Sequence, residues 1–127
     1  MKKTLLILFA LVVVLALVVH PGCKSQRNDI TGTWFFTLTF PGETFTETYT
    51  FVGTRQSGEV YWEGEALGTY SVIGDNVSFT LDYIDVDGDY TVEVYDGSFV
   101  GDDEMIGSVT VTIEGYGSAS GSWIAER

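Results

Sequence analysis

Hydrophobic and polar residues alternate along most of the chain, and this period of two runs from about residue 30 to the end. In residues 34–40, large apolar side chains occupy the even positions and threonines share the opposite face. Such alternation predicts a β-strand with one buried side, because successive side chains of a strand point to opposite faces. The pattern predicts eight strands, and no window beyond residue 30 shows the 3.6-residue period of an amphipathic helix.

The alternation assigns an inward face to each predicted strand. The residues expected on the inward face are Trp34, Phe36, Leu38, Phe40, Phe45, Tyr49, Phe51, Val60, Trp62, Gly68, Tyr70, Val72, Val77, Phe79, Leu81, Tyr83, Val92, Val94, Val109, Val111 and Ile113. In the sixth strand the two valines are expected to face inward, with Thr91 and Glu93 on the solvent side. Burial of about 20 large apolar side chains, at roughly 1.5 to 3 kcal/mol each, offsets much of the chain entropy without disulfides.

Short turns separate the strands. Asp87-Gly88 and residues 74–76 are typical of hairpin turns, so consecutive strands are expected to pair antiparallel. An open sheet of eight one-sided strands would expose an apolar face and two unpaired edges, whereas closure buries the face and removes the edges. We therefore expect an all-β fold in which residues 30–127 form an eight-stranded antiparallel up-and-down barrel.

The N-terminal residues follow a different pattern. Two lysines precede an unbroken apolar run of 15 residues over positions 5–19. A transmembrane helix needs about 20 apolar residues, so a secretory signal over residues 1–22 is favoured over a permanent membrane span.

The lone cysteine follows this segment directly. Gly22-Cys23 partially resembles the lipobox of bacterial lipoproteins, although His20 and Pro21 depart from its usual residues. The resemblance implies that Cys23 is lipidated and that residues 23–29 form a lipidated tether. The alternative is a free thiol in a linker, since a single cysteine cannot form an internal disulfide.

Charge excludes several function classes. After residue 22 the chain keeps all 18 acidic residues but only four basic ones, a net charge of −14, and it contains no histidine. Such a surface repels phosphate backbones, which argues against nucleic-acid binding. Without histidine or a second cysteine, the chain lacks His-based catalytic pairs and ordinary zinc ligands. We therefore expect no enzyme activity, no metal and no cofactor.

The acidic segment over residues 85–89 admits a calcium-binding interpretation, because alternate carboxylates around a glycine can converge on Ca²⁺. The EF-hand spacing fails, since its first and twelfth positions would fall on Tyr83 and Val94. A solvated hairpin turn is the favoured interpretation.

Motifs at both ends of the predicted barrel carry a family resemblance. Gly32-Thr33-Trp34 resembles the Gly-x-Trp signature of lipocalins and related calycins, and residues 121–127 resemble the closing strand of short bacterial lipocalin-like domains. The resemblance implies that Gly32 and Trp34 lie at a closed end of the barrel, with the terminal Arg127 across the indole of Trp34. A cation over an indole face contributes roughly 0.5 to 2 kcal/mol.

The resemblance also implies an open end opposite the closed one. Its turns are expected over residues 41–44, 64–68, 85–89 and 115–119. The acidic residues of this rim are Glu43, Glu65, Asp85, Asp87 and Asp89. A negative rim favours neutral or cationic molecules over anions.

The inward aromatic residues admit two interpretations, because an eight-stranded barrel is either filled by side chains or just wide enough for one small ligand. The candidate ligand-binding residues are Phe36, Phe45, Tyr49, Trp62, Tyr70 and Phe79.

These features predict a bacterial envelope protein that is lipid-anchored to a membrane, on its periplasmic or surface face. The expected function is binding of a small apolar or cationic ligand in a lipocalin-like barrel. One alternative is an acidic module that binds or inhibits a basic protein partner. Another is a structural envelope lipoprotein, and in both alternatives the barrel is filled.

Overall fold

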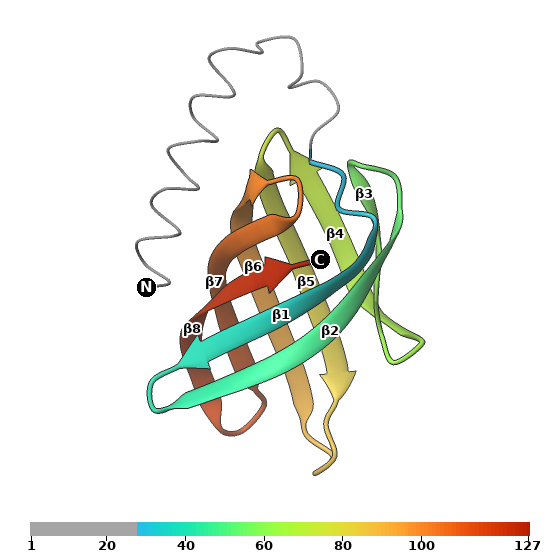
Figure 1. Cartoon of the computed structure of the whole chain (residues 1–127). Coiled ribbons are helices and arrows are strands. Elements are labelled where there is room, and N and C mark those ends of the chain that lie inside the picture. Colours follow the sequence, from blue (N-terminus) through green and yellow to red (C-terminus); the bar gives the residue numbers. More distant parts are fainter. Residues whose placement is uncertain (1–27) are drawn as a thin grey trace, which may run out of the picture.

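A computed structural model describes residues 28–127 of the chain (Figure 1). The strands are β1 (Gly32–Phe40), β2 (Glu43–Gly53), β3 (Ser57–Trp62), β4 (Glu65–Ile73), β5 (Asn76–Ile84), β6 (Tyr90–Gly101), β7 (Glu104–Ile113) and β8 (Gly117–Glu126). Each strand pairs antiparallel with the next, and β8 pairs with β1, which closes the barrel. The predicted all-β, eight-stranded antiparallel barrel is confirmed. Within this part of the chain, no helix is long and apolar enough to cross a membrane.

The alternating strand directions give the barrel two distinct ends. The closed end holds the start of β1, the end of β8 and the turns between β2 and β3, β4 and β5, and β6 and β7. The open end holds the other four turns, which lie at residues 41–42, 63–64, 85–89 and 114–116. Figure 1 shows β8 ending beside β1, close to where the described chain begins.

Aromatic rings fill the middle of the barrel between these ends. The ring centroid of Phe36 lies 5.1 Å from that of Tyr49 and 5.8 Å from that of Phe79. Phe79 stacks on Tyr95 with the centroids 4.3 Å apart. All four side chains are almost fully buried, and such ring pairs add about 0.5 to 1.5 kcal/mol beyond area burial.

The predicted inward face of β6 is wrong. Thr91 and Glu93 point into the barrel and are buried, whereas Val94 on the opposite face is 40% exposed. The cause lies further along the strand, where Tyr95 and Phe99 occupy the same face as Glu93 and are buried. Because a strand alternates strictly, burying these two large rings also turns Thr91 and Glu93 inward.

Glycines on neighbouring strands make room for the largest ring of β8. Gly97 and Gly107 lie directly opposite each other on β6 and β7. A Cβ atom on Gly97 would lie 2.5 Å from a ring carbon of Trp123 and closer still to the carbonyl oxygen of Ile106. Trp123 is 1% exposed, and its indole N–H donates to the carbonyl oxygen of Ser108 at 2.8 Å. The two glycines therefore let this indole pack directly against the backbone of β6 and β7.

Candidate functional site

Arg127 and Trp34 meet at the closed end. The guanidinium carbon of Arg127 lies 4.3 Å from the centroid of the Trp34 ring. The guanidinium also donates to the carbonyl oxygens of Thr31 and Asp102, at 3.0 and 2.9 Å, and pairs with the Asp103 carboxylate at 3.2 Å. The contact implied by the lipocalin resemblance is therefore present, and its partners all belong to the same end of the barrel.

The chain segment before β1 covers this end. Ile30 is fully buried, and its carbonyl oxygen accepts a hydrogen bond from the Trp34 indole at 2.7 Å. Gly32 has a φ of +112°, a conformation that L side chains rarely adopt, and it leads the segment into β1. Access to the interior from the closed end is blocked by these residues.

Four of the six candidate ligand residues belong to the ring-filled middle. Phe36, Tyr49, Tyr70 and Phe79 are each 3% exposed or less. The Tyr70 ring packs against that of Phe51, with the two centroids 5.5 Å apart. The Tyr70 hydroxyl donates to the carbonyl oxygen of Thr54 at 2.6 Å. These side chains contact one another instead of facing open space.

The other two candidates, Phe45 and Trp62, lie towards the open end. Phe45 is 45% exposed, and its ring centroid lies 6.1 Å from that of Phe40. Trp62 is half-buried against the core, and its indole N–H donates to Oε2 of Glu47 at 2.9 Å. Glu47 shares the inward face of β2 with Tyr49, so this carboxylate faces the interior.

A second carboxylate, Glu93, lies deeper between the open end and the middle. It is 9% exposed and accepts hydrogen bonds from the hydroxyls of Tyr83 and Tyr95, the latter at 2.6 Å. The Tyr95 hydroxyl also lies 3.1 Å from that of Tyr49. Burial raises the pKa of all three tyrosines above the ordinary value, and the Glu93 charge adds to this effect. The three hydroxyls therefore remain neutral donors over the physiological pH range.

Sequence reasoning missed both inward carboxylates. Glu93 was expected on the outer face of its strand, and Glu47 interrupts an otherwise aromatic inward face of β2. A usable signal was present, since Glu93, Tyr95 and Phe99 share one phase of the alternation.

No basic side chain of residues 28–127 balances these two carboxylates. This part of the chain contains two arginines, Arg55 and Arg127, and both lie at the closed end. Arg55 pairs with Asp29 at 3.8 Å, and Arg127 pairs with Asp103. The inner part of the open end therefore carries negative charge next to the Trp62 indole N–H and the Tyr83 hydroxyl.

The predicted acidic rim is spread over separate turns. Glu43, Glu65 and Asp87 are exposed. Asp85 holds its own turn, because one of its oxygens accepts the backbone N–H groups of Asp87 and Asp89, both at 2.9 Å. In the described range, no group of three or more Asp, Glu, His or Cys residues is arranged to hold a metal ion.

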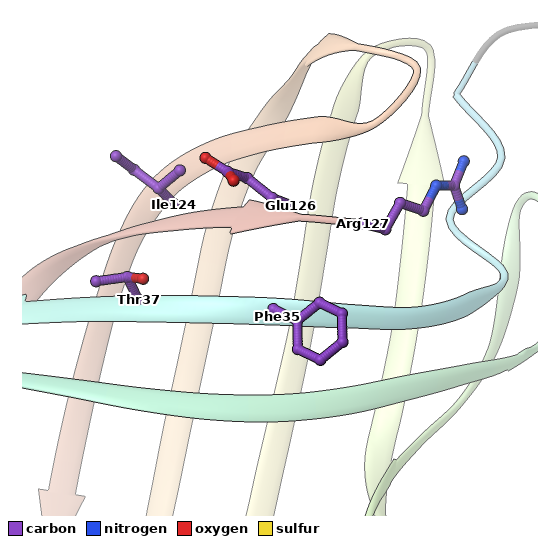
Figure 2. A pocket seen from close by; sticks show the side chains of 5 residues that line it. All are labelled: Phe35, Thr37, Ile124, Glu126 and Arg127. Atoms are coloured by element: carbon purple, nitrogen blue, oxygen red, sulfur yellow. The ribbon is translucent and has the colours of Figure 1, made fainter. Parts of the chain in front are cut away.

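Two grooves lie on the surface of the barrel. One, of about 590 Å³, includes Glu47, Trp62 and Glu63 in its lining and lies beside β2. The other, of about 280 Å³, lies on the outer face near the closed end, where Phe35 and Thr37 of β1 face Ile124 and Glu126 of β8 (Figure 2). Figure 2 shows Arg127 pointing away from these four side chains, and no charged group buried in that groove suggests a ligand.

Cys23, the predicted lipidation site, lies outside the described residues, as does the predicted signal segment.

Comparisons with known proteins identify the architecture alone. Neither the protein-family models nor the curated proteins gave a match. Among solved structures, the chain is similar to one described as a redesigned beta barrel, with a TM-score of 0.60 and 15% sequence identity. The similarity covers 81% of this chain and 97% of that one. It supports the barrel fold, and it fits a calycin-like barrel only coarsely.

Proposed function

We propose that this protein is a lipid-anchored binding protein of the bacterial envelope that holds a small cationic ligand at the open end of a lipocalin-like barrel. One observation carries the proposal: Glu47 and Glu93 face the interior, and no basic side chain in the described part of the chain pairs with either. The middle of the barrel is filled by rings, so the binding position is the open end and not a central cavity.

The proposed ligand is a cation for an electrostatic reason. A buried carboxylate loses its hydration, and neutral tyrosine hydroxyls compensate only part of that loss. A ligand cation adds the missing opposite charge. The aromatic faces of Trp62 and Tyr83 add cation–π attraction of about 0.5 to 2 kcal/mol each, and the half-exposed ring of Phe45 offers an apolar contact.

Titration with matched ligands tests the binding proposal. Hexyltrimethylammonium and heptanoate have similar apolar parts and opposite charges, so we expect saturable binding of the cation and at least about tenfold weaker binding of the anion. Trp fluorescence reports binding, because Trp34 and Trp123 are fully buried and Trp62 is not. The protein is the full chain in a neutral detergent.

Two variants make this result specific. Trp62→Phe should remove the fluorescence change while calorimetry still detects binding. Glu47→Gln keeps an acceptor for the Trp62 indole but removes the charge, and it should weaken cation binding. Equal affinity for both ligands would refute the charge argument, and no saturable binding of either would favour the alternative of a basic protein partner.

The membrane anchor is tested separately. Cys23→Ala should release the protein from the membrane fraction, because lipidation requires the thiol. A variant that remains membrane-bound after cleavage of its signal would contradict the anchor without affecting the ligand proposal.

A further inference from the structure

One strand of the barrel wall has an edge without a partner strand. β3 pairs with β2 only over the four residues from Thr50 to Gly53. Residues 43–49 of β2 pair with β1 on one side, and no strand within the described range pairs with them on the other. In an antiparallel ladder, alternate residues direct both backbone groups to the same side. About half of residues 43–49 therefore direct their N–H and C=O groups away from β1.

The groove of about 590 Å³ runs along β1 and β2 and reaches this edge. Its lining includes residues 35–37 of β1, residues 46–48 and Thr50 of β2, and residues 62–64 beyond the edge. Residues 43–46 are exposed on both faces, unlike the corresponding stretches of β1 and β5. The volume falls within the usual range of ligand sites, roughly 300 to 1,000 Å³.

The negative charges at this edge favour a positively charged partner strand. Glu47 and Glu63 both line the groove. One oxygen of Glu47 accepts the Trp62 indole, and the described residues place no donor on the other. Pairing of β2 with a second copy would bring Glu43 and Glu47 of both chains onto one short ladder, and like charges on a ladder are destabilising. A basic strand avoids this repulsion and brings opposite charges to Glu47 and Glu63.

We infer that the cation held at the open end is a lysine or arginine side chain of an extended polypeptide, which adds as a strand to residues 43–48 of β2. Backbone hydrogen bonds to the free edge supply affinity that is independent of sequence, and alternate basic side chains reach Glu47 and Glu63. This inference rests on the cation site of the proposed function, and it makes the cation a side chain of a polypeptide partner instead of a separate small ligand.

The test compares a peptide with a free cation on the full chain in a neutral detergent. The peptide is a capped hexapeptide of alternating lysine and valine, and the free cation is hexyltrimethylammonium. We expect the peptide to bind at least about tenfold more tightly and to protect backbone amides of residues 43–48 from hydrogen exchange. The same peptide with N-methyl groups on its central amides keeps every charge but cannot form the ladder, and it should lose that advantage.

A matched pair of variants separates the effect of the Glu47 charge from that of the overall negative charge of the protein. Glu47→Gln should weaken peptide binding by roughly tenfold, since it replaces a charge-assisted contact by a neutral one. Asp96→Asn removes an equal charge from the outer face of β6 and should leave binding unchanged.

The outcomes distinguish this inference from the proposed function. Binding of the free cation, with peptide and N-methylated peptide binding no more tightly, would overturn strand addition and leave the proposed function standing. Binding of neither probe would overturn both. Protection of residues 43–48 that grows with protein concentration in the absence of peptide would show that a second copy occupies the edge, which also overturns the inference.

Discussion

The two halves of the barrel differ in the residues that occupy their inward positions. Towards the closed end, aromatic and aliphatic side chains fill the interior, and Arg127 covers Trp34 from outside. Towards the open end, the inward positions include Glu47 and Glu93, and β2 loses its pairing with β3. We therefore expect the closed half to contribute most of the stability, while the open half carries buried charge and an unpaired edge.

The boundary between the halves is a row of hydroxyl groups. Tyr49 and Tyr95 belong to the ring cluster by their rings and to the Glu93 network by their hydroxyls. The inward face of one strand can therefore change from apolar to charged within two residues, because a tyrosine packs its ring in the apolar part and bonds its hydroxyl in the polar part.

Alkaline pH is expected to affect this boundary most strongly. Burial, and after it nearby negative charge, raises the pKa of Tyr49 and Tyr95 above the ordinary value near 10. From about pH 10 the unfolded chain loses protons that the folded barrel retains, so stability is present below that pH and falls as the pH rises. The loss is up to about 1.4 kcal/mol per group per pH unit. Urea unfolding at several pH values measures it, and a slope unchanged in the double Tyr-to-Phe variant would contradict the assignment.

Truncation of one ring in each half compares the two interiors directly. Phe36→Ala removes a 1% exposed ring from the centre of the cluster and should cost about 3 to 5 kcal/mol. Phe45→Ala removes a ring that is 45% exposed and should cost less than about 1.5 kcal/mol. The free energies of unfolding in urea give both values, and similar losses would show that the open half is as tightly packed as the closed one.

A single added methyl group tests how closely the middle of the barrel is packed. Gly97→Ala places Cβ against the Trp123 ring and the Ile106 carbonyl oxygen, and it should cost roughly 1 to 3 kcal/mol. Gly101→Ala, at the end of the same strand, meets nothing within 4 Å and serves as the control. Thermal unfolding distinguishes them, and a neutral Gly97→Ala would mean that the indole moves freely.

Removal of the terminal cation tests the closed end alone. Arg127→Ala should lower the free energy of unfolding by about 0.5 to 2 kcal/mol through loss of the contact with Trp34, and the lost hydrogen bonds to the carbonyl oxygens of Thr31 and Asp102 add to this effect. Arg55→Ala breaks only an exposed ion pair, which is worth about 0 to 1 kcal/mol, and is the matched control. Coinciding urea midpoints for the wild type and Arg127→Ala would show that the contact does not stabilise the barrel.

The smallest expected effect is a gain at the open end. Glu63 has a φ of +48° beside Gly64, in the two-residue turn between β3 and β4. Asparagine tolerates this left-handed conformation better than glutamate, so Glu63→Asn should raise stability by roughly 0.5 to 1 kcal/mol. The shift in thermal midpoint measures the gain, and a lower midpoint would indicate that the Glu63 side chain itself stabilises the turn.

Much of the fold could be predicted from local pattern. The alternation along β1 and β5 correctly placed Phe36 and Phe79 inside, because one phase of each strand is apolar throughout and the other is mostly polar, with Phe35 and Ile84 as exposed exceptions. The turns at Gly88 and Gly74 could also be predicted, because glycine next to aspartate between two alternating segments is typical of a turn. Both glycines adopt positive φ values in the structure. The ligand role of Phe45 and Trp62 and the lipidation of Cys23 stay predictions.

The sequence by itself determined the strand order, the antiparallel pairing and the closure of the barrel, because a period of two and short turns leave few other ways to bury the apolar faces. Only the tertiary structure decided which phase of β6 faces inward and where the ladder between β2 and β3 ends. Val92 and Val94 compete with Tyr95 and Phe99 for the interior, and the larger rings prevail because they pack against Phe36 and Trp34 of β1, which lies across the barrel from β6. Glu93 follows them inside because it shares their phase of the strand, and the hydroxyls of Tyr83 and Tyr95 donate hydrogen bonds to its carboxylate there.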